Sequence, residues 1–223
     1  MNKLSNLKTF SSDEFINNSA LALKNSIEEL LENSSTITIA LSGGNSPLPV
    51  YEKLSTFELE WNRITFFLVD ERCVPNSSSE SNYGNIKKVL FNNIDSSNFP
   101  VIKTMQSFKK CADNYQQKIL DNVKKINNIP SFDLIILGMG LDGHIASLFP
   151  KTKALNEDKN VVVLNDVPQL NTQRITMTFP LIMNAKKLVL LIKGEEKKKV
   201  FIDSLTQDLP VSFITPKLDI ILN

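Results

Sequence analysis

Short runs of β-branched and other apolar residues alternate with helix-like stretches along most of this chain, and this alternation limits the fold more than any other feature. A buried parallel strand is almost continuously apolar, whereas a covering helix repeats apolar residues every three or four positions. Alternation of the two predicts an α/β fold with a mostly parallel, Rossmann-like sheet and helices on both faces. The strand-like runs cover 36–41, 63–69, 132–137 and 187–192, and the helix-like stretches cover 11–33, 47–54, 82–91, 110–126 and 195–205.

Three further β-rich stretches predict a small additional β element, at an edge of the sheet or beside it. They cover 161–164, 174–179 and 211–214.

The chain has 223 residues, of which 42% are hydrophobic, and this is enough to bury a substantial core. It contains no internal repeat, low-complexity tract or linker. We therefore expect residues 1–223 to form a single domain.

The charge balance and the cysteine content exclude several functional classes. The 25 basic and 24 acidic residues give a net charge of +1, which favours neither a nucleic acid nor a membrane as partner. No segment resembles a signal sequence or a membrane span, so we expect a cytoplasmic location. Cys73 and Cys111 lack metal-ligand spacing and are interpreted as reduced thiols, and we expect no metal and no other cofactor. The oligomeric state is not predictable from these features, which also fit a monomer.

The residues that follow the four predicted strands carry most of the chemical information. In an open parallel sheet, ligands bind beyond the carboxyl ends of the strands. We therefore expect the four segments that follow to meet at one crevice. They are Ser42-Gly-Gly-Asn-Ser-Pro47, Asp70-Glu-Arg72, Gly138-Met-Gly-Leu-Asp-Gly-His144 and Lys193-Gly-Glu-Glu-Lys197.

The first of these segments is a glycine-rich turn ahead of a predicted helix. Gly43 and Gly44 permit backbone conformations that other residues resist, Ser46 is a suitable N-cap, and Pro47 suits the first helical position. Free amides at such a helix start attract phosphate, which makes the turn from Ser42 to Gly44 a candidate binding site. A plain glycine turn is an equally good interpretation, because the motif matches neither the Walker nor the dinucleotide pattern.

Basic side chains near the same crevice are candidate phosphate ligands, although each also has a simpler explanation. Arg72 offers a planar guanidinium suited to phosphate oxygens. Asp70 and Glu71 beside it would repel an anion, so we expect one carboxylate to serve another part of the substrate and one to be structural. Taken by itself, the Asp70-Glu71-Arg72 triplet is more simply explained as solvent-exposed residues at the end of a strand. Lys197 belongs to a run of lysines and Arg174 begins an alternating strand, so neither would be selected alone.

The segment 138–144 ends at the only histidine of the chain, in a loop that contains three glycines. A histidine side chain needs little tuning to act as a general base near neutral pH, which makes His144 a candidate catalytic residue. An isolated histidine is nevertheless more often structural. Asp142 either orients this ring or only caps a helix that runs towards Pro150.

Together these motifs resemble the 6-phosphogluconolactonase family. The blocks follow the family order over about residues 10–222. They are Leu41-Ser-Gly-Gly-Asn-Ser-Pro47 with Tyr51, Val69-Asp-Glu-Arg72 with Val74-Pro75 and Ser81-Asn82, Gly138-x-Gly-x-Asp-Gly-His-x-Ala-Ser-Leu-Phe-Pro150, and Arg174-Ile-Thr-Met-Thr178.

The resemblance implies that the substrate is a small sugar-phosphate lactone. The implied reaction is the hydrolysis of 6-phospho-D-glucono-1,5-lactone to 6-phosphogluconate, in the oxidative pentose phosphate pathway. His144 would be the general base for the attacking water, and Asp142 would support it. Arg72, Arg174, Lys197 and the Gly43-Gly44 turn would hold the phosphate.

The first alternative is a relative, glucosamine-6-phosphate deaminase, which shares the fold, the glycine turn and an Asp-Gly-His-Ile-Ala segment. In that enzyme a glutamate stands where this chain has Phe149, and a tyrosine stands where it has Arg72. Both differences favour the lactonase, because a phenyl ring cannot transfer a proton. Ile145 is the one feature that leans towards the deaminase. Asn45 and Lys151 also depart from the lactonase pattern, and neither departure removes a proposed catalytic group.

The second alternative belongs to another class, a sugar-phosphate-binding protein that catalyses no reaction. Such a protein would keep the fold and the phosphate ligands. The intact His144 argues against it.

Overall fold

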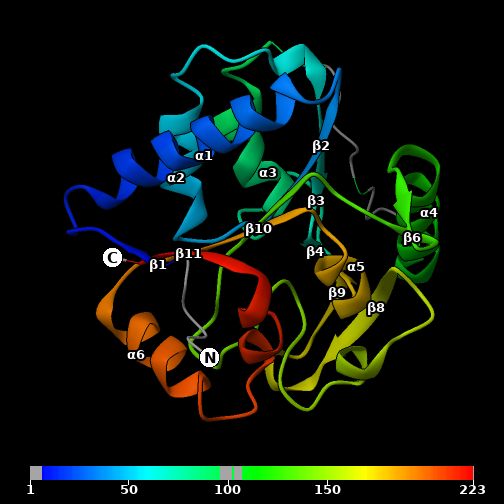
Figure 1. Cartoon of the computed structure of the whole chain (residues 1–223). Helices are drawn as coiled ribbons and strands as arrows, with labels where there is room; N and C mark the ends of the chain where they lie inside the picture. The colour runs from blue at the N-terminus through cyan, green and yellow to red at the C-terminus, as the bar shows by residue number, and fades with distance from the viewer. Residues whose placement is uncertain (1–6, 96–101, 103–106, 223) are drawn as a thin grey trace.

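The computed structural model describes residues 7–95, 102 and 107–222 of the chain. Its central feature is a parallel sheet of six strands in the order β1-β11-β10-β7-β2-β3 (Figure 1). The sheet confirms the expected α/β class. Its strands are β1 (Leu7–Thr9), β2 (Ile37–Leu41), β3 (Ile64–Leu68), β7 (Leu134–Leu137), β10 (Lys187–Ile192) and β11 (Leu218–Leu222).

Helices cover both sides of this sheet, with α1 and α2 on one side and α6 on the other (Figure 1). The helices are α1 (Phe15–Glu32), α2 (Pro47–Leu54), α3 (Asn82–Ile86), α4 (Phe108–Asn122), α5 (Phe179–Met183) and α6 (Glu195–Ser204). A π-helical turn, η2 (Lys87–Phe91), continues α3. The 3₁₀ turns are η1 (Trp61–Arg63), η3 (Lys153–Asn156), η4 (Pro168–Leu170), η5 (Pro210–Phe213) and η6 (Thr215–Lys217).

A second, antiparallel sheet lies beyond the carboxyl end of β3 and provides the expected additional β element. It contains β4 (Asp70–Arg72), β9 (Thr172–Met177) and β8 (Val162–Val167), in that order. Val69 joins the two sheets, because its amide bonds to Leu41 in the large sheet and its carbonyl accepts a bond from Met177 in the small one. The chain therefore places β4 and β9 directly over the carboxyl edge of the parallel strands.

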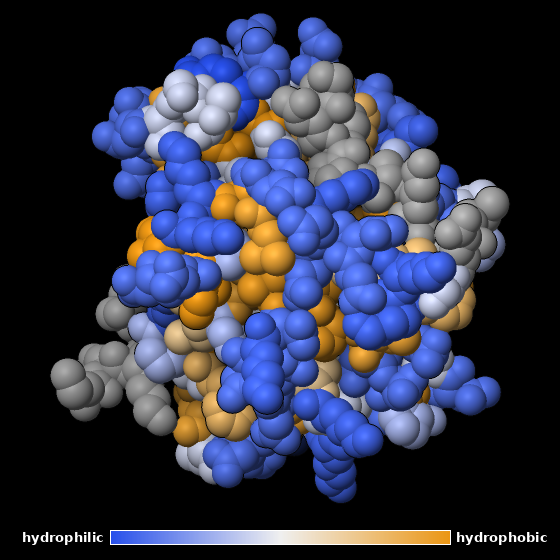
Figure 2. Space-filling model, turned by 90° about the vertical axis from the view of Figure 1, so that its right-hand side faces the viewer, coloured by the Kyte–Doolittle hydropathy of each residue, from blue (hydrophilic) through white to orange (hydrophobic). Residues whose placement is uncertain are grey.

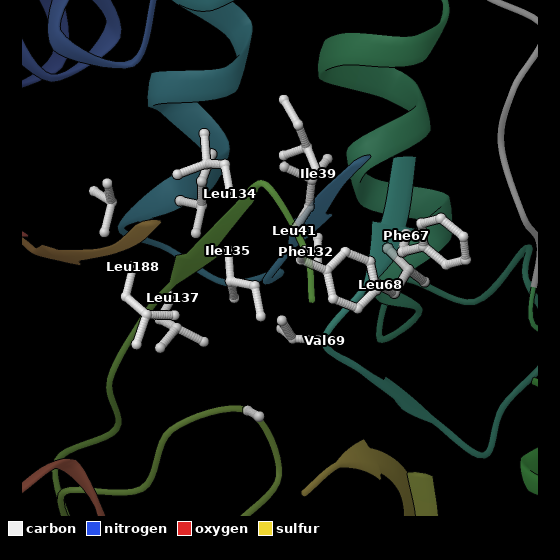
Figure 3. Close-up of a cluster of buried hydrophobic side chains, with 14 of the residues drawn as sticks. Ile39, Leu41, Phe67, Leu68, Val69, Phe132, Leu134, Ile135, Leu137 and Leu188 are labelled. Carbon is white, nitrogen blue, oxygen red and sulfur yellow. The ribbon is translucent and has the colours of Figure 1, made fainter. Parts of the chain in front are cut away.

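The core lies between the central strands and their covering helices. Figure 3 shows apolar side chains from β2, β3, β7 and β10 packed together, among them Ile39, Phe67, Leu134 and Leu188. Each of these is at most 2% exposed. Burial of such a side chain contributes about 1.5–3 kcal/mol relative to leaving it in water. The strands are therefore held firmly, and the loops at their ends start from fixed positions.

The strand predicted near the C-terminus was placed wrongly. Residues 211–214 do not form the expected strand but lie mostly in η5, whose first φ is fixed by Pro210. The strand at this end is β11, which the sequence pattern did not indicate because Asp219 interrupts its apolar run.

The helices expected over 11–33 and 110–126 are both shorter in the structure. The first begins at Phe15, and the Ser11 hydroxyl donates to the Glu14 carboxylate rather than capping a backbone amide. The second ends at Asn122, after which a hairpin forms from β5 (Lys125–Ile126) and β6 (Ile129–Pro130). Asn127 and Asn128 make this turn at φ values of 52° and 66°, a conformation that asparagine tolerates well.

The face shown in Figure 2 is largely hydrophilic, with apolar side chains visible between the polar ones. Large exposed apolar residues are spread along the chain rather than confined to one segment; they are Leu7, Leu21, Ile126, Leu141, Leu170, Ile202 and Phe213. None of the helices in the described part of the chain has the length and apolar character needed to cross a bilayer.

Candidate active site

A cavity of about 250 Å³ opens at the carboxyl edge of the parallel sheet, where the loops after β2, β7 and β10 meet β4 and β9. A larger hollow of about 730 Å³ lies beside Arg63 at the opposite ends of the strands, but its wall contains Glu28, Glu32, Glu58 and Glu60 and is unsuited to an anion. All of the candidate site residues except Asp142 line the smaller cavity; they are Ser42, Gly43, Gly44, Asp70, Arg72, His144, Arg174 and Lys197.

The glycine turn between β2 and α2 presents unpaired hydrogen-bond donors. The amides of Gly43, Gly44 and Asn45 donate to no acceptor in the part of the chain that the structure describes. The Ser42 hydroxyl is buried, lines the cavity and is also without a partner. Buried polar groups normally have partners, so these donors are suited to a ligand.

Ser46 does not cap α2 with its side chain, contrary to the sequence prediction. Its backbone is already helical, with φ −81° and ψ −49°, and its hydroxyl accepts a bond from the Lys193 amide at 3.3 Å. This bond ties the glycine turn to the end of β10. The first turn of α2 itself offers no free N–H, because Pro47 and Pro49 have none and the Leu48 amide donates to the Gly44 carbonyl at 3.2 Å. The donors at this edge of the cavity are therefore the amides of the turn that precedes the helix.

Asn82 is a cavity residue that sequence reasoning did not select, although the Ser81-Asn82 pair belongs to the family pattern. It donates to the Asp70 carbonyl at 2.9 Å and to the Asp70 carboxylate at 3.1 Å. A Cβ added to Gly43 would lie 2.1 Å from Asn82 Oδ1. Only glycine fits there, and this explains the first glycine of the turn.

The two acidic residues at the start of β4 have different surroundings. Asp70 lines the cavity, and its carboxylate accepts a 2.5 Å hydrogen bond from the Ser147 hydroxyl. Glu71 points away from it and is fully buried, where it accepts bonds from the Ser81 hydroxyl and from the amides of Arg72, Asn82 and Tyr83. Burial raises the pKa of Glu71, and the bonds from the three amides oppose this shift. Glu71 therefore secures the loop that carries Asn82.

Three basic side chains face the cavity from separate elements. Arg72 on β4 and Arg174 on β9 occupy directly paired positions, and the buried Nε of each forms no hydrogen bond within the described part of the chain. Burial lowers the pKa of Arg174, and the nearby charge of Arg72 lowers it further. Burial also lowers the pKa of Lys197, in the first turn of α6. Desolvated cations of this kind attract an anion more strongly than exposed ones.

The loop after β7 holds the imidazole of His144 against a carboxylate. Asp142 Oδ1 lies 2.5 Å from His144 Nδ1 and 3.2 Å from the His144 amide. Partial burial raises the pKa of Asp142, but the hydrogen bonds and charge of His144 outweigh it and leave that pKa below its usual range. Because Nδ1 is taken by Asp142, Nε2 is the ring nitrogen left for a reacting molecule.

Asp142 does not cap a helix. The residues that follow it form a series of turns, in which Gly143, Ala146 and Lys151 have positive φ values. Because no helix forms between Asp142 and Pro150, the interpretation of Asp142 as the partner of the ring is the one that the geometry supports.

The residues that the structure describes contain no group of three His, Cys, Asp or Glu side chains placed to hold a metal ion. Cys73 and Cys111 are not joined in a disulfide. Burial raises the pKa of Cys73 to about 12, so this thiol is protonated at neutral pH and is not an activated nucleophile.

The carboxyl edge of this α/β sheet brings together a turn with unpaired amides, two paired arginines and an Asp–His pair, an arrangement suited to proteins that act on phosphorylated small molecules. Within that class, the chain belongs to the family of glucosamine-6-phosphate isomerases and 6-phosphogluconolactonase, whose model matches residues 11–221.

Individual relatives agree with this assignment. The 6-phosphogluconolactonase of Thermotoga maritima is 37% identical over 198 residues, which cover 87% of each chain. That of Synechocystis is 35% identical over 194 residues and covers 82% of this chain and 80% of the relative. The crystal structure of the Thermotoga maritima 6-phosphogluconolactonase superimposes with a TM-score of 0.87 at 33% identity, over 97% of this chain and 98% of the other.

Proposed function

We propose that this protein hydrolyses 6-phospho-D-glucono-1,5-lactone to 6-phosphogluconate. The observation that carries the proposal is that the only imidazole of the chain and a cluster of basic and amide donors line the same small cavity. The 6-phosphogluconolactonases among its relatives supply the substrate by similarity.

The phosphate of the substrate binds between the glycine turn and the basic side chains. Arg72, Arg174 and Lys197 neutralise its charge, which is roughly −1.5 to −2 for a monoester at neutral pH. The amides of Gly43 and Gly44 supply further donors at the start of α2. The Asp70 carboxylate repels phosphate, so it receives a hydroxyl group of the sugar.

His144 activates the water that opens the lactone. Asp142 holds Nδ1, so Nε2 accepts a proton from the water while the water oxygen attacks the lactone carbonyl carbon. The resulting tetrahedral oxyanion collapses and breaks the bond to the ring oxygen. That oxygen takes the proton back from the imidazolium, which leaves a hydroxyl on the sugar and a new carboxylic acid. The acid then releases its proton to solvent.

The test is an assay with freshly prepared lactone, in which acid release is followed against spontaneous opening in the same buffer. The wild type is expected to accelerate opening, and His144→Ala should lower kcat by about 10²- to 10⁴-fold. Inorganic phosphate should still bind to the variant, because the phosphate ligands are intact. A near-normal kcat in His144→Ala would refute the role of the imidazole.

A parallel assay with glucosamine 6-phosphate separates the alternatives. Ammonia release without acid release from the lactone would identify a deaminase. Phosphate binding without either reaction would identify a binding protein. Phe149 and Arg72 stand at the two positions that distinguish this chain from the deaminase pattern, so we expect acid release alone.

A further inference from the structure

The side chain of Phe149 contacts both the imidazole of His144 and the guanidinium of Arg174. Its ring stacks on the His144 ring, with centroids 3.9 Å apart and planes inclined by 28°. The Arg174 guanidinium carbon lies 5.5 Å from the centroid of the same phenyl ring. Phe149 is only 3% exposed and does not itself line the cavity. One apolar side chain thus contacts two residues to which the reaction assigns separate tasks.

Besides Phe149, the imidazole is constrained by Asp142 and by the backbone of Gly140. Asp142 bonds to Nδ1 but is 44% exposed, so this bond alone leaves the ring free to swing about it. The Gly140 backbone packs close to the ring, since a Cβ there would lie 2.1 Å from His144 Cε1. The imidazole is therefore confined by Gly140 and by the flat face of Phe149.

We infer that Phe149 is a positioning residue for both His144 and Arg174, an inference that rests on the proposed lactonase function for its kinetic consequences. Stacking fixes the plane in which Nε2 meets the water. Contact with the phenyl face holds the Arg174 guanidinium, whose Nε forms no hydrogen bond with the residues that the structure describes. Aromatic pairs and cation–π contacts supply orientation as well as energy. Phe149 therefore links the position of the Arg174 guanidinium to the orientation of the His144 ring.

The direct test is NMR of the single histidine, which gives one set of imidazole signals without overlap. Protons stacked over a phenyl face are shielded by its ring current. In Phe149→Leu, which keeps most of the apolar volume, the His144 ring protons should move downfield. In Phe149→Tyr, which keeps the aromatic face, they should stay near the wild-type position. Phe91→Leu is the matched control, because Phe91 is also buried and packs against other rings, those of Phe66 and Tyr83, and does not line the cavity.

Kinetics separate positioning from simple packing. Phe149→Leu should lower kcat by about three- to tenfold through His144 and raise KM by about two- to fivefold through Arg174. It should also shift the acidic limb of the pH profile, and Phe149→Tyr should restore most of each loss. In a His144→Ala background, Phe149→Leu should cause no further loss of kcat, while the effect on KM remains.

Three results would overturn the inference: unshifted histidine signals in a folded Phe149→Leu protein, an equal kinetic loss in Phe91→Leu, or a full additional loss of kcat in the His144→Ala background. The NMR signals, and the affinity for inorganic phosphate measured by thermal shift, require no turnover. They decide the role of Phe149 even where the wild type fails to open the lactone.

Discussion

Arg72 and Arg174 face each other across the β4–β9 ladder as directly paired positions, so two guanidinium groups share one wall of the cavity. Like charges directly opposite each other destabilise a sheet. Here the carboxylates of Asp70 and Glu71 accept bonds from the side chains of Ser147, Asn82 and Ser81 and are not ion-paired with either guanidinium group. An anion bound between the two guanidinium groups would offset their repulsion. The pair therefore favours the anion-bound protein over the unbound one.

We predict that inorganic phosphate stabilises the protein through these two arginines. At a phosphate concentration ten times its Kd, the stabilisation is about 1.4 kcal/mol, which for a chain of this size corresponds to a rise in Tm of about 3–6 °C. Arg72→Gln or Arg174→Gln should abolish most of this rise. Without phosphate, either variant should melt close to the wild type, because the mutual repulsion is removed together with the charge. Differential scanning fluorimetry with a phosphate titration measures both effects.

The control for this experiment is Lys159→Gln, which removes one exposed positive charge outside the cavity. It should keep the full response to phosphate. An equal loss of response in this variant would show that phosphate acts through net charge and not through the paired arginines.

A second prediction concerns the carboxylate of Asp142. Asp142→Asn keeps the shape of the side chain but removes the charge that stabilises the imidazolium formed when the water gives up its proton. We expect kcat at neutral pH to fall by roughly 10- to 100-fold, less than on removal of the imidazole itself. Steady-state kinetics at pH 7, corrected for spontaneous opening, test this. An unchanged kcat would separate the role of Asp142 from that of the imidazole.

The same pair also makes stability depend on pH. The folded-state pKa of Asp142 is depressed, so its contribution is present above the ordinary aspartate value of about 3.9 and is lost as pH falls through the folded-state value. Because Asp142 is 44% exposed, the contribution is small. The wild type should be slightly more stable than Asp142→Asn at neutral pH, and the two should converge in acid. Urea unfolding at several pH values measures this difference.

Much of the fold follows from local sequence pattern, because buried parallel strands and covering helices have distinct periodicities. The strands at 37–41, 64–68, 134–137 and 187–192 were predictable on this basis. β1 and β11 were not, since β1 has only three residues, all exposed, and β11 contains Asp219. Their pairing is decided by contacts between the two ends of the chain, which no local pattern records.

The site residues that directly follow strands were predictable from the sequence. The residues that reach the site through tertiary contacts were less predictable. The segments at 42–44, 70–72 and 138–144 meet as expected because parallel strands end at one edge. Asn82 reaches the cavity only because Glu71 holds its loop. The stack of Phe149 on His144 depends on turns with positive φ at Gly143 and Ala146, and an alanine in that conformation leaves no sequence signal.

A further prediction compares two glycines of the same loop. A Cβ on Gly140 would lie 2.1 Å from Cε1 and 2.2 Å from Nδ1 of His144, whereas a Cβ on Gly138 would meet nothing nearer than Pro47, at an ordinary 3.5 Å. Gly140→Ala should therefore displace the imidazole and lower kcat by about 10²-fold, the usual effect of a misplacement of about 1 Å. Gly138→Ala should cause a much smaller loss. Steady-state kinetics and the histidine NMR signals measure both, and equal losses would contradict the steric argument.

The last prediction concerns Glu71, whose two carboxylate oxygens accept four hydrogen bonds inside the protein. In Glu71→Gln, an NH₂ group replaces one oxygen and faces either the Arg72 and Asn82 amides or the Tyr83 amide and the Ser81 hydroxyl. The hydroxyl can turn and accept a bond from the NH₂ group, so at least one buried amide loses its acceptor. Such an unpaired group costs about 1–3 kcal/mol, and we expect the free energy of unfolding to fall by at least about 1 kcal/mol. Urea unfolding at pH 7 measures the loss, and Glu80→Gln, in the same loop but exposed, is the control. Because Glu71 fixes the loop that carries Asn82, KM should rise in the folded variant as well. A stable variant with normal KM would show that the loop is held by its other contacts.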